Sequence, residues 1–262
     1  TGYATTQNGT LIITNGTVNL NSVAELLNAY SGSGNVTVVG SGVLELKTLR
    51  ISQTGGSPDL NVVNVHTGGV IRMDRFYIDE KTQSKGRVNF NGGTVVAKSS
   101  RGDFMGIAHT NWFSGIFFTV REGGAVIDSN GVDVDSKLPL YSGAAHDGGL
   151  RKRGAGTFTL ANTNMYNGAT VVEGGTLTLG VNNALPPTNT VMASSNALFN
   201  ANNRTQTLAA LGGGGTATNL AALTVTGTLD PGDADAFGTL TLAAEPLSIA
   251  GCTLSVNVST NG

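Results

Sequence analysis

The sequence predicts an all-β fold, a β-solenoid of about ten coils, and three observations predict it. Gly accounts for 38 of the 262 residues, roughly twice its usual share in soluble proteins. Gly-Gly steps begin at residues 68, 92, 123, 148 and 174. The segments between these steps alternate apolar residues with Thr, the period-two pattern of strands with one buried face. Similar units at similar intervals favour stacking of coil on coil over a Greek-key sandwich.

The Gly-Gly steps are the predicted corners of the coils. Each step follows a strand end and two mostly polar residues, as in 65–71 and 172–177. Glycine adopts positive φ without a Cβ clash, so we expect one Gly-rich corner per coil. At about 25 residues and roughly 4.8 Å per coil, the chain would form a rod about 50 Å long. The ends of such a rod expose unpaired strand edges that need covering.

One segment near the N-terminus carries helical signals. Ser22, with Glu25 three residues later, forms a capping-box pattern just before Leu26 and Leu27. We therefore expect a short helix over residues 22–30 that covers the first coils.

An aromatic-rich stretch near 101–118 interrupts the regular pattern, at the place where the Gly-Gly spacing is widest. It contains Phe104, Trp112, Phe113, Phe117 and Phe118. A solenoid interior takes small aliphatic side chains more readily than these rings. Three interpretations therefore stay open: a local core around an expanded coil, an intersubunit contact, or sugar stacking. The candidate contact or sugar-binding residues are Trp112, Phe113, Phe117 and Phe118.

Residues 148–180 read GGLRKRGAGTFTLANTNMYNGATVVEGGTLTLG and resemble the autotransporter-associated β-strand repeat. That repeat places a Lys after Gly-Gly-Leu, then Gly-Ala-Gly-Thr-Leu-Thr-Leu, Asn-x-Tyr-x-Gly-x-Thr and a Gly-Thr-Leu strand. The residues at those positions include Lys152, Gly154, Gly156, Thr157, Leu160, Asn164, Tyr166, Gly168, Thr170, Gly175, Thr176 and Leu177, and Phe158 replaces a usual Leu. The resemblance implies a right-handed parallel β-helix on a secreted or surface protein. It implies no reaction and no ligand.

The resemblance also suggests how the chain is organised. Residues 149–262 continue in the style of the repeat. Residues 1–148 share only its general pattern of Gly-rich turns between short strands. We expect one continuous solenoid made of both parts. Asn164, Tyr166 and Thr170 fall in a Gly-rich corner, where we expect their side chains to satisfy backbone groups between coils.

Composition excludes several classes of partner. Charged residues make up 12% of the chain and the net charge is −2, so there is no concentrated basic face for nucleic acid or anionic lipid. No stretch approaches the roughly 18 apolar residues of a membrane-spanning helix. The single cysteine, Cys252, alternates with Leu254 and Val256, as a small core residue would. The chain starts at Thr1 rather than Met, so we expect a trimmed product of a secreted bacterial protein.

Catalytic and cofactor motifs are missing from the sequence. The three His residues are not at metal-ligand spacing, and no Gly-x-Ser-x-Gly or phosphate-loop motif occurs. We therefore expect no catalytic residues and no cofactor. Parallel β-helices include polysaccharide lyases, which cluster carboxylates on one face. Asp133 and Asp135 would share a strand face, with Asp128 nearby, yet a turn before a solvated strand explains all three.

A weak calcium candidate lies near the C-terminus. Asp230, Asp233 and Asp235 surround a Pro-Gly turn and could supply three of the 6–8 oxygens that Ca²⁺ takes. Turn chemistry alone accounts for these residues, so we expect no metal site.

These features predict a non-enzymatic extracellular solenoid that acts in surface display, adhesion or self-assembly into a fibre. Its expected partners are further copies of itself, other surface proteins or glycans. The alternative is a β-helix that binds or degrades polysaccharide.

Overall fold

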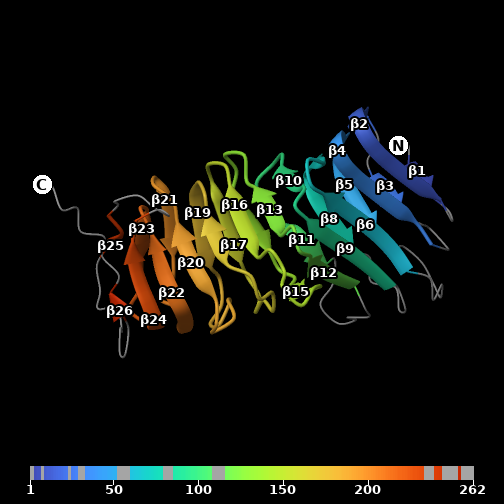
Figure 1. Cartoon of the computed structure of the whole chain (residues 1–262). Coiled ribbons are helices and arrows are strands. Elements are labelled where there is room, and N and C mark those ends of the chain that lie inside the picture. The colour runs from blue at the N-terminus through green and yellow to red at the C-terminus, as the bar shows by residue number, and fades with distance from the viewer. Residues whose placement is uncertain are drawn as a thin grey trace, which may run out of the picture.

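The computed structural model describes residues 3–6, 9–22, 25–28, 33–51, 60–78, 85–107, 116–232, 239–243 and 253–254. These residues form parallel strands and no helix. The strands stack into a rod with β1 near one end and β25 and β26 at the other (Figure 1). None of the described segments is a helix that could cross a membrane. The stacked parallel sheets confirm the β-solenoid prediction.

One face of the rod is a sheet with a strand from each successive coil. In order along the rod its eleven strands are β1 (Tyr3–Thr6), β3 (Glu25–Asn28), β5 (Thr48–Ile51), β8 (Arg75–Ile78), β11 (Arg101–Ile107), β14 (Val134–Ser136), β17 (Thr157–Leu160), β19 (Gly175–Leu179), β21 (Ala197–Asn200), β23 (Thr216–Thr218) and β25 (Thr241–Ala243). Register partners lie as close in sequence as Leu198 and Thr216 and as far apart as Arg101 and Val134. The ten steps between these eleven described strands agree with the prediction of about ten coils.

The second sheet has fifteen strands and bends around the other two faces of the rod. The bend lies in β4 (Asn35–Glu45), whose first residues pair with β6 (Leu60–His66) and whose last residues pair with β7 (Val70–Met73). We call the two parts the short face and the long face. The short face contains β6, β9 (Lys85–Asn91), β12 (Ile116–Val120) and β15 (Leu140–Ser142).

The long face runs to the C-terminal end of the rod. Its strands are β7, β10 (Thr94–Ala97), β13 (Ala125–Asp128), β16 (Leu150–Arg153), β18 (Thr170–Val172), β20 (Thr190–Ala193), β22 (Gln206–Gly213), β24 (Leu223–Pro231) and β26 (Thr253–Leu254). β2 (Thr10–Asn19) pairs with β4 at the N-terminal end and spans both faces.

The core consists of columns of inward side chains. Because side chains alternate along a strand, in-register pairing places like positions directly above one another. One buried column of the short face contains Val36, Val63, Val88, Phe118 and Leu140. Phe118 also packs on Phe76 and Phe90, with ring centroids 5.3 and 5.9 Å apart. Part of the aromatic-rich stretch therefore forms a local core.

The Gly-Gly steps form the corners of the coils. One glycine of each step has positive φ: Gly68, Gly92, Gly124, Gly149 and Gly175. Coils also approach closely here, since a Cβ on Gly68 would lie 2.2 Å from the Gly40 carbonyl oxygen. The prediction of one Gly-rich corner per coil is confirmed at these five steps.

The prediction of a helix over residues 22–30 is wrong. Glu25–Asn28 form β3, which pairs with β1 on one side and β5 on the other. Leu26 points into the core and is 2% exposed. An isolated helix this short is marginal in water, whereas a strand here satisfies the backbone of both neighbours.

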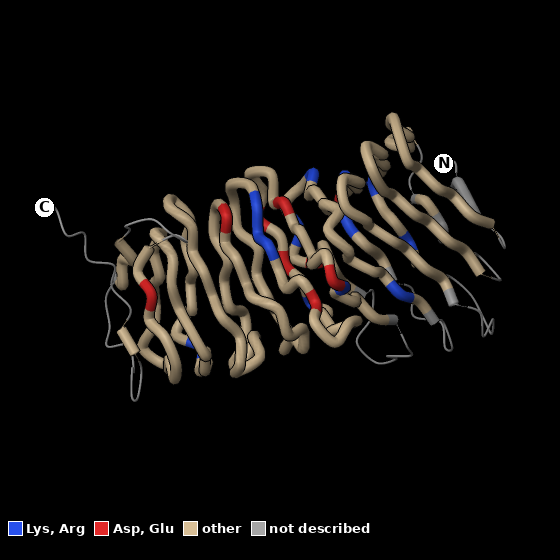
Figure 2. Tube along the Cα trace, viewed as in Figure 1, with Lys and Arg blue, Asp and Glu red and all other residues tan. Residues whose placement is uncertain are grey.

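Charged residues gather along the middle of the rod and become sparse toward its C-terminal end (Figure 2). Thr side chains replace them on the eleven-stranded sheet, where Thr157 and Thr159 lie in register with Thr176 and Thr178. Cys252, expected in the core, lies outside the described residues.

Candidate binding groove on the short face

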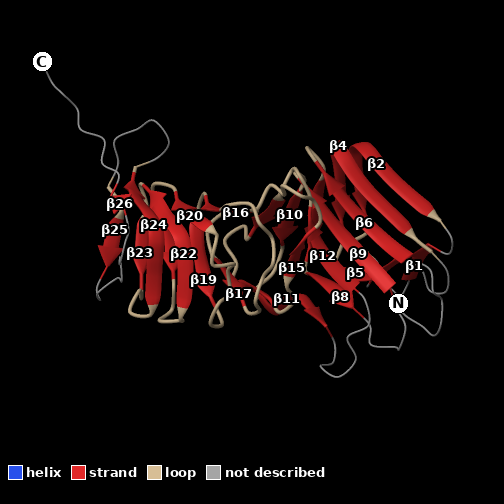
Figure 3. Cartoon of the chain, turned by 60° about the horizontal axis from the view of Figure 1, so that its bottom comes forward, coloured by secondary structure: helices blue, strands red, loops and turns tan. Residues whose placement is uncertain are grey.

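A groove of about 410 Å³ lies on the outer surface of the short face. Its lining comes from three neighbouring strands and the residues that follow them: Arg87, Phe117, Thr119, Arg121, Tyr141, Ser142 and Gly143. The short face ends here, because loops follow β15 in the next coil (Figure 3). The groove therefore sits where a regular sheet gives way to an irregular surface.

The strand period explains why these side chains point outward. Phe117 and Thr119 alternate along β12 with Phe118 and Val120, which are 1% and 0% exposed and face the core. Phe117 is 38% exposed, and Thr119, at 6%, forms the floor. Two adjacent phenylalanines thus have opposite roles.

The strand register brings residues from distant coils together. Phe117 lies beside Arg87 of β9, and Thr119 lies beside Tyr141 of β15. The Phe117 and Tyr141 rings meet edge to face, with centroids 5.2 Å apart and planes at 76°. This arrangement leaves part of each ring face available to a ligand.

Gly143 opens the groove. A Cβ at this position would lie 2.1 Å from Thr119 Cγ2 and 2.9 Å from Arg121 Cδ. Contacts this short do not occur in folded proteins, so any larger residue would displace the groove floor.

The groove carries two guanidinium groups. Arg121 forms an ion pair with the exposed Glu122, with N and O 3.6 Å apart. Arg87 is exposed and has no ion pair among the described residues. The lining contains no carboxylate, so the groove favours a ligand that carries negative charge.

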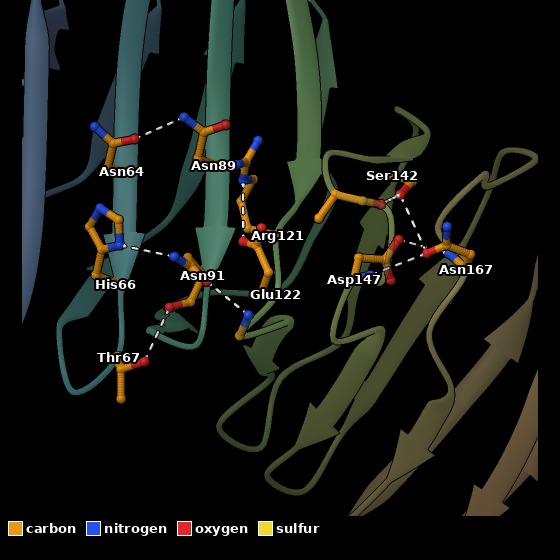
Figure 4. A network of polar contacts seen from close by, with 12 residues as sticks. Asn64, His66, Thr67, Asn89, Asn91, Arg121, Glu122, Ser142, Asp147 and Asn167 are labelled. Carbon is orange, nitrogen blue, oxygen red and sulfur yellow. Dashed lines mark hydrogen bonds and ion pairs between the residues drawn. The ribbon is translucent and has the colours of Figure 1, made fainter.

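Amide side chains form a ladder on the short face beside the groove (Figure 4). Asn89 Nδ2 donates to Asn64 Oδ1 over 2.8 Å, and Asn91 Nδ2 lies 3.3 Å from His66 Nδ1. Asn91 Oδ1 accepts a hydrogen bond from the Gly123 amide. These contacts join successive coils and fix the strands that position Arg87 and Thr119.

The four aromatic site candidates have different positions. Phe117 lines the groove, whereas Phe118 is buried in the core. Trp112 and Phe113 lie outside the described residues. Sequence reasoning missed Arg87, Arg121 and Tyr141, which come from separate coils. The alternation Phe117, Thr119, Arg121 was the signal that could have identified one side of the groove.

Two of the three carboxylates considered for catalysis accept hydrogen bonds from backbone amides. Asp133 Oδ1 accepts a hydrogen bond of 2.7 Å from the Thr157 amide in the next coil, and Asp128 Oδ1 accepts one of 2.8 Å from the Asn130 amide. Asp135 lies on β14 and is half-buried. None of them lines the groove.

The calcium candidates are only partly described. Asp230 lies on β24, and Asp233 and Asp235 fall outside the described residues. Within the described part of the chain, no three His, Cys, Asp or Glu side chains come together as a metal-binding group.

A buried lysine closes the corner that follows β16. Lys152 is fully buried, and its Nζ donates to the carbonyl oxygens of Arg153, Gly154 and Gly174 over 2.7–2.9 Å. Burial lowers the pKa of Lys152 to about 8, although Asp128 and Asp133 favour its charged form. The ammonium group therefore joins two successive coils.

Side chains also replace strand pairing where the short face is interrupted. Asn164 Oδ1 accepts from the Leu140 amide of the preceding coil, and Asn164 Nδ2 donates to the Ala184 carbonyl of the following one. Gln206 acts similarly, exchanging two hydrogen bonds with the backbone of Leu185. Both amides are almost fully buried.

A second buried network lies beside Asn164. The Tyr166 hydroxyl lies 2.6 Å from Thr170 Oγ1, which donates to Asn189 Oδ1 over 2.8 Å. The Thr170 proton is committed to Asn189, so Tyr166 is the donor to Thr170. Asn189 Nδ2 in turn donates to the Gly168 carbonyl. Burial raises the pKa of the Tyr166 hydroxyl above its ordinary value, because the charged phenolate would lose its hydration there.

These two networks use the residues that define the resemblance to a known repeat, and a family comparison agrees with them. Residues 150–179 match the passenger-associated-transport-repeat. No curated protein and no solved structure shows significant similarity to the chain. The repeat confirms the resemblance, and it covers β16 to β19, near the middle of the rod (Figure 1).

The passenger-associated repeat is thus a coil whose characteristic polar residues are buried. Lys152, Asn164 and Thr170 each bond to a group of an adjacent coil, and Tyr166 bonds to Thr170. This confirms the prediction for Asn164, which bonds to backbone groups of both neighbouring coils, whereas the Tyr166 and Thr170 hydroxyls bond to side chains rather than to the backbone. The repeat explains how the rod stacks, whereas the groove lies outside it, on the preceding coils.

Proposed function

We propose that this chain belongs to an extracellular, passenger-like surface protein and that it acts as a non-enzymatic rod for display and contact. The observation that carries the proposal is the passenger-associated repeat at residues 150–179, whose strands pair with earlier and later coils in the eleven-stranded sheet and on the long face. A rod of this kind holds contact surfaces away from the cell and can meet glycans, other surface proteins or further copies of itself.

The location is tested by protease treatment of intact cells that express the natural protein. We expect an antibody against this chain to label unpermeabilised cells or the culture medium, and protease to remove the cell-bound label. A periplasmic protein serves as the protected control. Label that appears only after permeabilisation would contradict the proposal.

Self-assembly is the finer form of this proposal. Electron microscopy of the secreted material would then show filaments with a regular axial repeat. Monodisperse monomers at high concentration would contradict assembly while leaving surface display intact.

Polysaccharide binding is a second candidate, favoured by the aromatic and basic groove on the short face. Degradation is less well supported than binding, because the groove lining contains no acid-base pair of carboxylates. Release of reducing or unsaturated ends from acidic glycans, abolished in an Asp133→Ala, Asp135→Ala variant, would establish a degrading enzyme instead.

A further inference from the structure

We propose that the groove on the short face binds an anionic oligosaccharide, one that carries uronate carboxylates or sulfate esters. The inference deepens the contact role proposed above. It rests on that proposal only for the place where the protein meets its ligand, outside the cell. It depends on the purified chain alone, so its failure can be distinguished from failure of surface display.

The charged groups of the groove define the ligand's charge. Arg87 is exposed and unpaired among the described residues, and Arg121 has only the exposed Glu122, 3.6 Å away, as a counter-charge. A guanidinium presents a planar set of donors that fits a carboxylate or sulfate with two parallel hydrogen bonds. With no carboxylate in the lining, the anions must come from the ligand.

The spacing of the charges favours an extended ligand. Arg87 and Arg121 lie on neighbouring strands and are four positions apart along the strand direction, because Phe117 is the register partner of Arg87. At roughly 3.3 Å per residue, their backbones are separated by about 14 Å. A chain with regularly spaced acidic groups matches this separation better than a single small anion does.

The surface between the two arginines suits sugar rings. Phe117 and Tyr141 present apolar ring surface there, and the Tyr141 hydroxyl has no hydrogen-bond partner among the described residues. Aromatic rings pack against the apolar face of a pyranose, and a free hydroxyl can bond its substituents. The edge-to-face angle of 76° leaves no parallel slot into which a nucleobase could insert between the two rings.

Binding is measured by isothermal titration calorimetry with a galacturonic acid tetrasaccharide. A fully methyl-esterified form of the same tetrasaccharide is the neutral ligand, and a chondroitin sulfate tetrasaccharide tests whether sulfate replaces uronate. We expect binding of at least one anionic ligand that weakens as salt increases. We also expect binding of the methyl ester to be at least tenfold weaker than that of the free acid.

The variants assign the binding to the groove. Arg87→Gln should weaken binding several-fold, and Arg87→Gln with Arg121→Gln at least tenfold. Because Arg87 is exposed and makes no ion pair in the described structure, we expect its single substitution to leave the fold intact. Arg204→Gln, which removes an exposed arginine between β21 and β22, is the matched control and should bind as the unmodified chain does.

Three outcomes would overturn the proposal. The first is that neither anionic tetrasaccharide binds. The second is that the double variant, with an unchanged unfolding midpoint, binds as tightly as the unmodified chain. The third is that inorganic polyphosphate of equal charge, or a single-stranded oligonucleotide, binds as tightly as the saccharides, which would show attraction to charge alone.

Discussion

The two glycines of the Gly174-Gly175 step show how closely single residues fit between coils. Gly175 has a φ of +62°, and a Cβ there would lie 2.5 Å from the carbonyl oxygens of Gly154 and Gly156. Gly174 has ordinary space, since its nearest neighbour would be 3.7 Å from a Cβ. The backbone conformation and the close packing therefore require glycine at position 175, whereas position 174 has room for a Cβ.

We expect Gly175→Ala to lower the free energy of unfolding by about 2 kcal/mol or more, through left-handed backbone strain and the clash. Gly174→Ala, the matched control, should change it by no more than about 0.5 kcal/mol. Denaturant unfolding curves measure both. Equal effects of the two substitutions would contradict the described corner.

The buried ammonium of Lys152 predicts a dependence of stability on pH. Its pKa in the folded chain is about 8, below the ordinary 10.5. Between these values the unfolded chain holds the proton and the folded chain does not, so the free energy of unfolding rises with pH. The cost of burying the charge is fully present below pH 8 and is relieved above it.

We expect the unmodified chain to gain stability from pH 8 to pH 10 relative to Lys152→Met, in which this titration is absent. Denaturant midpoints across that range give the measurement. Parallel pH profiles for the two proteins would show that Lys152 is not buried as described.

Residue-level prediction of the groove was partial for a physical reason. The composition identified the aromatic stretch, yet it could not separate Phe117 from Phe118, because that distinction depends on which strand face is inward. Arg87 and Tyr141 lie in other coils, and only the strand register places them beside β12.

At the scale of single elements, β3 is a strand although its local sequence favours a helix, because it pairs with the strands of the neighbouring coils. The capping-box pattern of Ser22 and Glu25 favours a helix, but helical backbone would leave the edges of β1 and β5 unpaired. The in-register contact of Leu26 with Leu49 decides the conformation. Short-range signals predict poorly in a solenoid because most contacts come from the coils above and below.

The corner after β17 depends on its buried polar network rather than on strand pairing. We expect Tyr166→Phe to lower the free energy of unfolding by about 1–2 kcal/mol, because Thr170 loses its donor in a fully buried site. Tyr141→Phe, on an exposed groove, is the control and should be nearly neutral. Thermal or denaturant unfolding tests the difference, and equal stability of the two variants would contradict the network.

At the scale of the whole molecule, the sequence predicted the number of coils better than their shape. Gly-Gly spacing and the Thr-apolar alternation identified the coils because both repeat along the chain. The bend of the fifteen-stranded sheet in β4 and the end of the short face after β15 had no repeating signal. Beyond β15, side chains such as Asn164 and Gln206 take the place of strand pairing.

The central claim is that the N-terminal coils and the passenger-associated repeat form one continuous stack. Its most direct test is a cross-coil disulfide between β14 and β17, where Asp135 and Thr159 are register partners. Their Cα atoms are about 4.8 Å apart, within disulfide range. Thr157 is two residues before Thr159 on β17. Its Cα atom would lie roughly 8 Å from that of Asp135, outside disulfide range.

In a Cys252→Ser background, we expect Asp135→Cys with Thr159→Cys to oxidise to an intramolecular disulfide, detected by mass spectrometry of the digested protein. Asp135→Cys with Thr157→Cys, the off-register control, should remain reduced under the same conditions. Free thiols in the in-register pair, or equal cross-linking of both pairs, would contradict the continuous solenoid.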